Sequence, residues 1–101
     1  IAERHPTGFP KAVGRFDSKN VNREGQWVFF NGYGRAEEIG SFLRNKPTGT
    51  WRRIDWKNAK IYEFSYHGGK ATKPRYVGKL TPEVVNDLPD AFFEFRSLVG
   101  R

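Results

Sequence analysis

The supply of aromatic side chains constrains the fold of this chain more than any other feature. Phe, Trp and Tyr make up 16% of the 101 residues, whereas all hydrophobic residues together make up only 37%. A domain of this size buries roughly 60 to 70% of the surface that its unfolded chain exposes, so large side chains are needed to fill its core. We therefore expect one domain whose core is built largely from aromatic rings.

The absence of Cys excludes several classes of protein. Without Cys the chain has no disulfide framework, no thiolate metal site and no redox chemistry of its own. No apolar run approaches the roughly 18 residues of a membrane span, and the first residues have no apolar signal-peptide centre. We therefore expect an intracellular protein, cytoplasmic or associated with nucleoid or nuclear material, with no cofactor, no metal and no membrane partner.

Positive charge is concentrated in the middle of the sequence. Eighteen Lys and Arg stand against 11 Asp and Glu, a net charge of +7. Residues 44–79 carry ten basic and two acidic residues, a net charge of +8 that exceeds that of the whole chain, whereas residues 1–43 are nearly balanced and residues 80–101 are net acidic. A field of one sign over one region attracts polyanions. The basic residues of this region are Arg44, Lys46, Arg52, Arg53, Lys57, Lys60, Lys70, Lys73, Arg75 and Lys79.

The pattern along the chain predicts an irregular N-terminal arm over residues 1–10 and a single domain over residues 11–101, with no apparent internal repeat. Pro and Gly interrupt any regular pattern in the arm. Because Pro74 cannot donate a ladder hydrogen bond, the last strand lies at a sheet edge or contains a bulge there. The strands expected from alternating or continuous apolar residues cover 11–16, 26–30, 50–56, 60–66 and 72–79.

A helical period is expected after residue 35. Ala36, Ile39 and Phe42 fall on one helical face, and acidic residues at the start and basic residues at the end match the helix dipole. Pro47 then prevents continuation. The sequence thus predicts a helix over about residues 36–46.

A second helix is expected at the C-terminus. Thr81 is a suitable cap, Pro82 fits the first helical position, and Pro89 kinks or splits the helix. The predicted fold is therefore α+β, with an antiparallel sheet of four to five strands and two helices packed on one face.

Aromatic rings are interleaved with the basic residues. Lys and Arg neutralise phosphates and flat rings stack on bases, so Trp51, Trp56 and Tyr76 are candidates for stacking. We expect a small nucleic-acid-binding domain rather than an enzyme. It would contact the phosphate backbone of single-stranded DNA or RNA, or of a duplex, through residues 44–79.

Catalysis is an alternative interpretation. A small metal-independent ribonuclease or toxin-type nuclease needs a general base and a general acid beside cations that hold phosphate. His67 with Glu63 or His5 would supply these groups. The spacing of histidines and carboxylates matches no recognised metal site.

A protein-interaction module is a further alternative. Acidic residues recur on one side of the expected C-terminal helix, and an aromatic residue lies off its apolar stripe, where it would be exposed. These candidates for contact with a protein partner are Glu83, Asp87, Asp90, Glu94 and Phe93.

Overall fold

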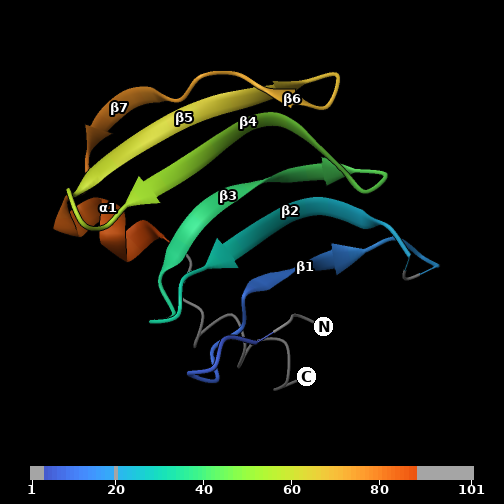
Figure 1. The fold of residues 1–101 in the computed structure, drawn as a ribbon, viewed down its shortest axis with the longest axis horizontal. Coiled ribbons are helices and arrows are strands. Elements are labelled where there is room, and N and C mark those ends of the chain that lie inside the picture. Colours follow the sequence, from blue (N-terminus) through green and yellow to red (C-terminus); the bar gives the residue numbers. More distant parts are fainter. Residues whose placement is uncertain (1–3, 20, 89–101) are drawn as a thin grey trace.

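A computed structural model describes residues 4–19 and 21–88 of the chain. Within them, seven antiparallel strands form one curved sheet, followed by one short helix (Figure 1). The elements are β1 (Ala12–Phe16), β2 (Arg23–Phe30), β3 (Ala36–Leu43), β4 (Lys46–Asp55), β5 (Lys60–His67), β6 (Lys70–Ala71), β7 (Arg75–Lys79) and α1 (Pro82–Asp87).

The sheet is a meander in which each strand from β1 to β5 pairs with the next along the chain. β6 and β7 then share the outer side of β5, where Tyr66 pairs with Ala71 and Tyr62 with Tyr76. Pro74 lies between these two short strands. The expected position of Pro74, at an interruption of an edge strand, is confirmed.

The expected α+β architecture, with two helices on a sheet of four to five strands, is wrong. The helix expected over 36–46 is β3 and the turn after it. Gly40 and Phe42 are buried and Ser41 and Leu43 are exposed, which is the period of a strand. Glu37 stands in an irregularity where the pairing with β2 shifts, and this irregularity produced the apparent helical spacing.

The start of the second helix is confirmed by α1. The Thr81 hydroxyl accepts a hydrogen bond from the Val84 N–H at 3.3 Å, and Pro82 occupies the first turn. The described helix has 6 residues. The kink expected at Pro89 lies outside the described residues.

The sheet contains an internal repeat that the sequence interpretation missed. Residues 25–48 are here called the first unit and residues 49–72 the second unit. When Gly25 is aligned with Gly49, the strand pairing is the same from Gly25 to Phe29 and from Gly49 to Arg53, and only the first unit then shifts its register. Trp27 pairs with Gly40 in the first unit, and Trp51 pairs with Phe64 in the second. Repeats of roughly 20 to 50 residues are typical of chains built from one stacked supersecondary unit.

Each unit ends in the same two-residue turn. Arg44 and Asn45 both have positive φ, of 52° and 69°, and so do Gly68 and Gly69, at 57° and 86°. Two positive φ values in a two-residue hairpin loop define the type I′ turn, whose twist matches that of the flanking strands. The two turns therefore hold β3–β4 and β5–β6 in equivalent geometry.

Aromatic rings on one face of the sheet form the larger core cluster. Trp27, Phe42, Trp51 and Phe64 are buried there, and Phe42 meets Trp51 edge to face with ring centroids 5.4 Å apart. A smaller cluster on the other face contains Val13, Val28, Phe30 and Ala36. The expectation of an aromatic core is confirmed.

Glycines make room for the two tryptophans of the repeat. A Cβ atom on Gly14 would fall inside the ring of Trp27, and one on Gly40 inside the ring of Trp51. The Trp51 indole N–H donates to the Thr48 carbonyl at 3.2 Å, which satisfies its polar atom. Each Trp therefore lies flat over the preceding strand.

Candidate nucleic-acid interface

The structure distributes the ten basic residues of 44–79 over five places rather than one. Arg44, Lys46 and Lys70 lie at the end of the sheet formed by the β3–β4 and β5–β6 turns. Lys57, Lys60 and Lys79 lie at the opposite end, beside the β4–β5 turn, and Lys73 and Arg75 lie along the outer edge of β5. Arg52 and Arg53 are consecutive in β4, so their side chains point to opposite faces.

Two basic residues outside this region join the first group. In a meander, alternate turns lie at the same end, so the β1–β2 turn is beside the β3–β4 and β5–β6 turns (Figure 1). We call this end of the sheet the basic end; its basic residues are Lys19, Arg23, Arg44, Lys46 and Lys70. The sequence interpretation missed Lys19 and Arg23 because it counted charge along the chain and not by strand end.

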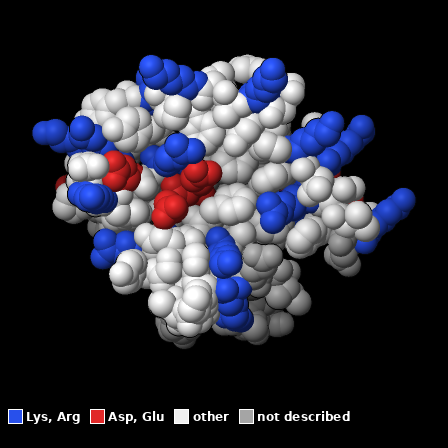
Figure 2. All heavy atoms as spheres, in the orientation of Figure 1, with Lys and Arg blue, Asp and Glu red and all other residues white. Residues whose placement is uncertain are grey.

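Figure 2 shows the contrast between the two ends on one face of the molecule. On the right, where the turns of the basic end lie, Lys and Arg are grouped with little acidic surface between them. On the left and in the centre, Asp and Glu lie among the basic side chains. The positive field of the protein is therefore uneven.

The acidic groups at the basic end already have hydrogen-bond partners. Asp17 Oδ1 accepts from the backbone N–H groups of Lys19, Val21 and Asn22 at 3.1–3.4 Å. The Val21 N–H is the largest of the influences that hold the pKa of Asp17 below its ordinary value. Glu24 Oε1 accepts from the Arg44 N–H at 3.1 Å.

Arg23 is held against the aromatic core. Its guanidinium carbon lies 4.7 Å from the centre of the Trp27 ring and 5.3 Å from that of Phe42. Cation–π contacts of this kind fix a long side chain without neutralising its charge. Arg23 therefore presents a positioned positive charge at the basic end.

The three rings expected to stack on bases have different environments. Trp51 is 3% exposed and belongs to the core, so its ring offers no free face. Trp56 is half-buried, with its indole N–H donating to the Ala36 carbonyl at 2.7 Å and the Arg35 guanidinium over its ring. Tyr76 is 49% exposed, on the strand at the sheet edge.

The alternative catalytic residues are not brought together. His5 Nε2 is 2.7 Å from the carbonyl oxygen of Phe30, at the end of β2. His67 is exposed at the last position of β5, which is the opposite end of the sheet. Glu63 is four residues before His67 on the same strand, about 13 Å away, and its carboxylate pairs with Arg52 and Arg75.

The residues of the protein-interaction alternative are only partly described. Glu83 and Asp87 are exposed on α1. Asp90, Phe93 and Glu94 lie outside the described residues.

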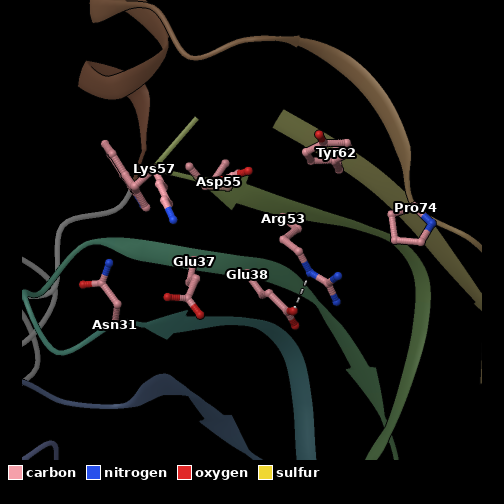
Figure 3. Close-up of a pocket in the computed structure, with 10 residues that line it drawn as sticks. Asn31, Glu37, Glu38, Arg53, Asp55, Lys57, Tyr62 and Pro74 are labelled. Atoms are coloured by element: carbon pink, nitrogen blue, oxygen red, sulfur yellow. Dashed lines mark hydrogen bonds and ion pairs between the residues drawn. The ribbon is translucent and has the colours of Figure 1, made fainter. Parts of the chain in front are cut away.

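A hollow of about 510 Å³ lies on the sheet face across β3, β4 and β5, away from the basic end (Figure 3). Glu38 and Arg53 cross its floor, joined by an ion pair of 2.9 Å between Oε2 and Nε. Asp55 is at one side, where the Asn58 side-chain amide and then its backbone N–H donate to the carboxylate and lower its pKa. Sequence interpretation missed this hollow because it placed Glu37 and Glu38 in a helix.

Comparison with known proteins assigns no family. No family model matches the chain, and no curated protein and no solved structure matches it significantly. Within residues 4–19 and 21–88, no group of three or more His, Cys, Asp or Glu is placed to hold a metal ion. Over the same residues, no helix is long and apolar enough to cross a membrane.

Proposed function

We propose that the basic end binds the phosphate backbone of nucleic acid without reading its sequence. The observation that carries this proposal is the grouping of Lys19, Arg23, Arg44, Lys46 and Lys70 on adjacent turns. Asp17 and Glu24 also lie there and keep their negative charges, so the five basic residues outnumber the acidic ones and leave this end net positive. Electrostatic contact with phosphates supplies essentially all of non-specific nucleic-acid binding.

The rigidity of the turns supports this proposal. The two type I′ turns are two strands apart, so their tips are separated by about 10 Å. Lys46 and Lys70, the first residues after these turns, therefore stand at a fixed spacing. Because the backbone at these positions is already fixed, binding to phosphates has to order only the lysine side chains.

Salt-dependent binding to fluorescent oligonucleotides tests the proposal. Anisotropy titrations with single-stranded DNA, single-stranded RNA and duplex DNA should show affinity falling as salt rises. The slope of log affinity against log salt should be about −0.7 to −0.9 for each phosphate contacted. Absence of binding to all three at about 50 mM salt would contradict the proposal.

A matched pair of triple variants separates the basic end from overall charge. Arg44→Asn/Lys46→Ala/Lys70→Ala removes three charges at the basic end, and Asn suits the positive φ of residue 44. We expect a slope shallower by about 2 to 3 and an affinity lower by about two orders of magnitude. Lys60→Ala/Lys73→Ala/Lys79→Ala removes three charges elsewhere and should change affinity by less than about threefold.

One outcome of this comparison would overturn the assignment, and so would a separate measurement with lipid vesicles. Equal losses in the two triple variants would mean that net charge, and not the basic end, attracts the nucleic acid. The exposed apolar residues Val21 and Leu43 also lie on these turns, at 66% and 58% exposure. Tighter binding to vesicles of anionic lipid than to any of the oligonucleotides would identify a membrane surface as the partner instead.

A further inference from the structure

The hollow across β3, β4 and β5 has the size and lining of a small-molecule site. Its volume of about 510 Å³ is within the range of about 300 to 1,000 Å³ that ligand pockets occupy. Tyr62, Trp56 and Pro74 provide apolar surface around it, and Glu37, Arg53 and Lys57 provide polar groups (Figure 3). It lies apart from the turns of the basic end.

Two polar side chains of the hollow are available to a ligand. Among the described residues, the Glu37 carboxylate and the Lys57 ammonium make no hydrogen bond or ion pair. Glu38 and Arg53 are paired with each other, yet each keeps further acceptor or donor capacity. The hollow therefore offers strong acceptors and strong donors side by side.

The mixture of charges selects the chemistry of the ligand. An anion would meet the carboxylates of Glu37, Glu38 and Asp55, and a cation would meet Arg53 and Lys57. A neutral molecule rich in hydroxyl groups gains from both, because each hydroxyl donates one hydrogen bond and accepts others. Both charged classes of ligand are therefore disfavoured.

An aromatic ring on the wall favours a cyclic ligand. Tyr62 is half-buried, and its ring meets that of Tyr76 edge to face at 5.9 Å, which holds it in place. A fixed aromatic ring supplies apolar contact area at low entropic cost. The C–H face of a sugar ring can pack on such a surface while its hydroxyls reach the polar groups.

The internal repeat shows that the sheet does not require this hollow. In the first unit the positions of Arg53 and Tyr62 are held by Phe29 and Glu38, which pair in the same register. Phe29 packs against the core rings Phe42 and Trp51 there. Arg53 and Tyr62 thus belong to the lining only in the second unit, and Asn31, Glu37 and Glu38 of the first unit complete the hollow from the neighbouring strand.

From these observations we infer that the hollow binds a neutral saccharide, with the sugar ring against Tyr62 and its hydroxyls hydrogen-bonded to Glu37, Arg53 and Lys57. The site is separate from the basic end and independent of nucleic-acid binding. It places two ligand classes on different parts of one sheet.

NMR titration of the ¹⁵N-labelled chain with cellotriose, chitotriose, mannotriose and galactotriose tests this inference. At least one trisaccharide should move the indole N–H signal of Trp56, which lines the hollow, and leave those of Trp27 and Trp51, which are buried. The effect should persist at high salt because the ligand is uncharged. Absence of any shift with all four sugars would overturn the inference. So would salt-sensitive shifts with spermidine or inorganic phosphate that are as large as those with the sugars.

Variants identify the site without relying on one substitution. Tyr62→Ala should weaken binding about tenfold and Tyr62→Phe should preserve it, because the ring supplies the contact. Glu37→Gln, at an exposed position, should weaken it without affecting folding. Tyr33→Ala, 85% exposed on the β2–β3 turn, should leave it unchanged, as should the triple variant at the basic end. Loss of sugar binding in Tyr33→Ala but not in Tyr62→Ala would contradict the assigned position.

Discussion

The first and second units share one backbone arrangement and differ in the side chains that it carries. Both begin with Gly-x-Trp, at Gly25 and Gly49, and both end in a type I′ turn. Between these features, the apolar pair Val28 and Ile39 is replaced by the ion pair Arg52 and Glu63 in the same register. The shared positions therefore build the sheet, and the positions that differ give the second unit its polar surface.

Burial explains why the two units tolerate different residues at one register position. Val28 is buried and packs in the smaller core cluster with Phe30 and Ala36. The Arg52 and Glu63 side chains are 49% and 28% exposed, so water screens their interaction. An ion pair at this position is compatible with the second unit because, among residues 4–19 and 21–88, neither core cluster includes Arg52 or Glu63.

Exchanging the pairs between units should produce the largest effect on stability. Val28→Arg/Ile39→Glu places two charges against a packed apolar cluster, and we expect a loss of roughly 3 to 5 kcal/mol in the free energy of unfolding. Urea denaturation followed by tryptophan fluorescence measures it. The reverse exchange, Arg52→Val/Glu63→Ile, should change stability by less than about 1 kcal/mol. Similar losses in the two exchanges would show that the units are equally packed at this position, against our interpretation.

Gly40 provides the next test, because it is the position where the first unit accommodates the Trp of the second. A methyl group in Gly40→Ala would occupy the space of the Trp51 ring, and we expect a loss of about 3 kcal/mol from the forced displacement. Gly78→Ala is the matched control, since a Cβ atom there meets nothing within 4 Å. Thermal unfolding of the two variants measures the difference. If Gly40→Ala were as stable as Gly78→Ala, Trp51 would not be packed flat on β3.

The strands could largely be predicted from the sequence, because their signal is local. Residues 60–66 alternate cleanly, and the buried run at 26–30 is continuous in apolar and aromatic residues. Both are strands in the structure, and Trp27 and Val28 are buried on opposite faces of the sheet. The short helix after Thr81 was predictable for the same reason, since its cap and first-turn proline are adjacent in sequence.

The strand β3 could not be recognised from local pattern because its period is broken at Glu37. Gly40 in this strand leaves the space that the Trp51 ring occupies. This role can be seen only when Trp51 is placed over Gly40. The recurrence of Gly-x-Trp, first at Gly25 and again at Gly49, would have revealed the repeat, and with it the strand between the two motifs.

The candidate sites were less predictable than the strands. A count of charge along the chain located Arg44, Lys46 and Lys70, but it also included Arg52 and Arg53, which the sheet separates onto opposite faces. Lys19 and Arg23 became part of the basic end only through the order of the turns. The end of the sheet at which a charge lies depends on how many strands precede it in the chain. Missing one strand therefore assigns every later charge to the wrong end.

The two type I′ turns differ in a way that predicts a smaller effect. Asn45 Oδ1 accepts from the Arg23 N–H at 3.3 Å, whereas the equivalent residue of the second unit, Gly69, has no side chain. Asn45→Ala should cost about 1 to 2 kcal/mol, from the lost hydrogen bond and from a positive φ that Ala disfavours. Asn45→Gly relieves the second cause and should cost about 0.5 to 1 kcal/mol. Chemical denaturation distinguishes them, and an Ala variant no less stable than the Gly variant would contradict the positive φ at this position.

The smallest predicted effect concerns Asp55, which occupies the position of the second unit that Asn31 occupies in the first. Both side chains accept from the turn that follows: Asn31 from the N–H groups of Tyr33 and Arg35, and Asp55 from the N–H and side-chain amide of Asn58. Only Asp55 titrates, and the Asn58 amide, followed by its backbone N–H, holds the pKa of Asp55 below its ordinary value. Its stabilising contribution is therefore complete above the unfolded pKa of about 3.9 and is lost as the pH falls through the folded pKa.

Asp55→Asn converts this position to the residue found in the first unit, and it should make stability less dependent on pH below about pH 5. Urea midpoints measured from pH 7 down to pH 2 check this expectation. Asp17→Asn, at the basic end, is the control for an aspartate whose pKa is also lowered but whose turn belongs to neither unit. An acid limb as steep in Asp55→Asn as in the unmodified chain would show that other carboxylates govern acid unfolding. In that case the Asp55 turn of the second unit would contribute to stability in the same pH-independent way as the Asn31 turn of the first.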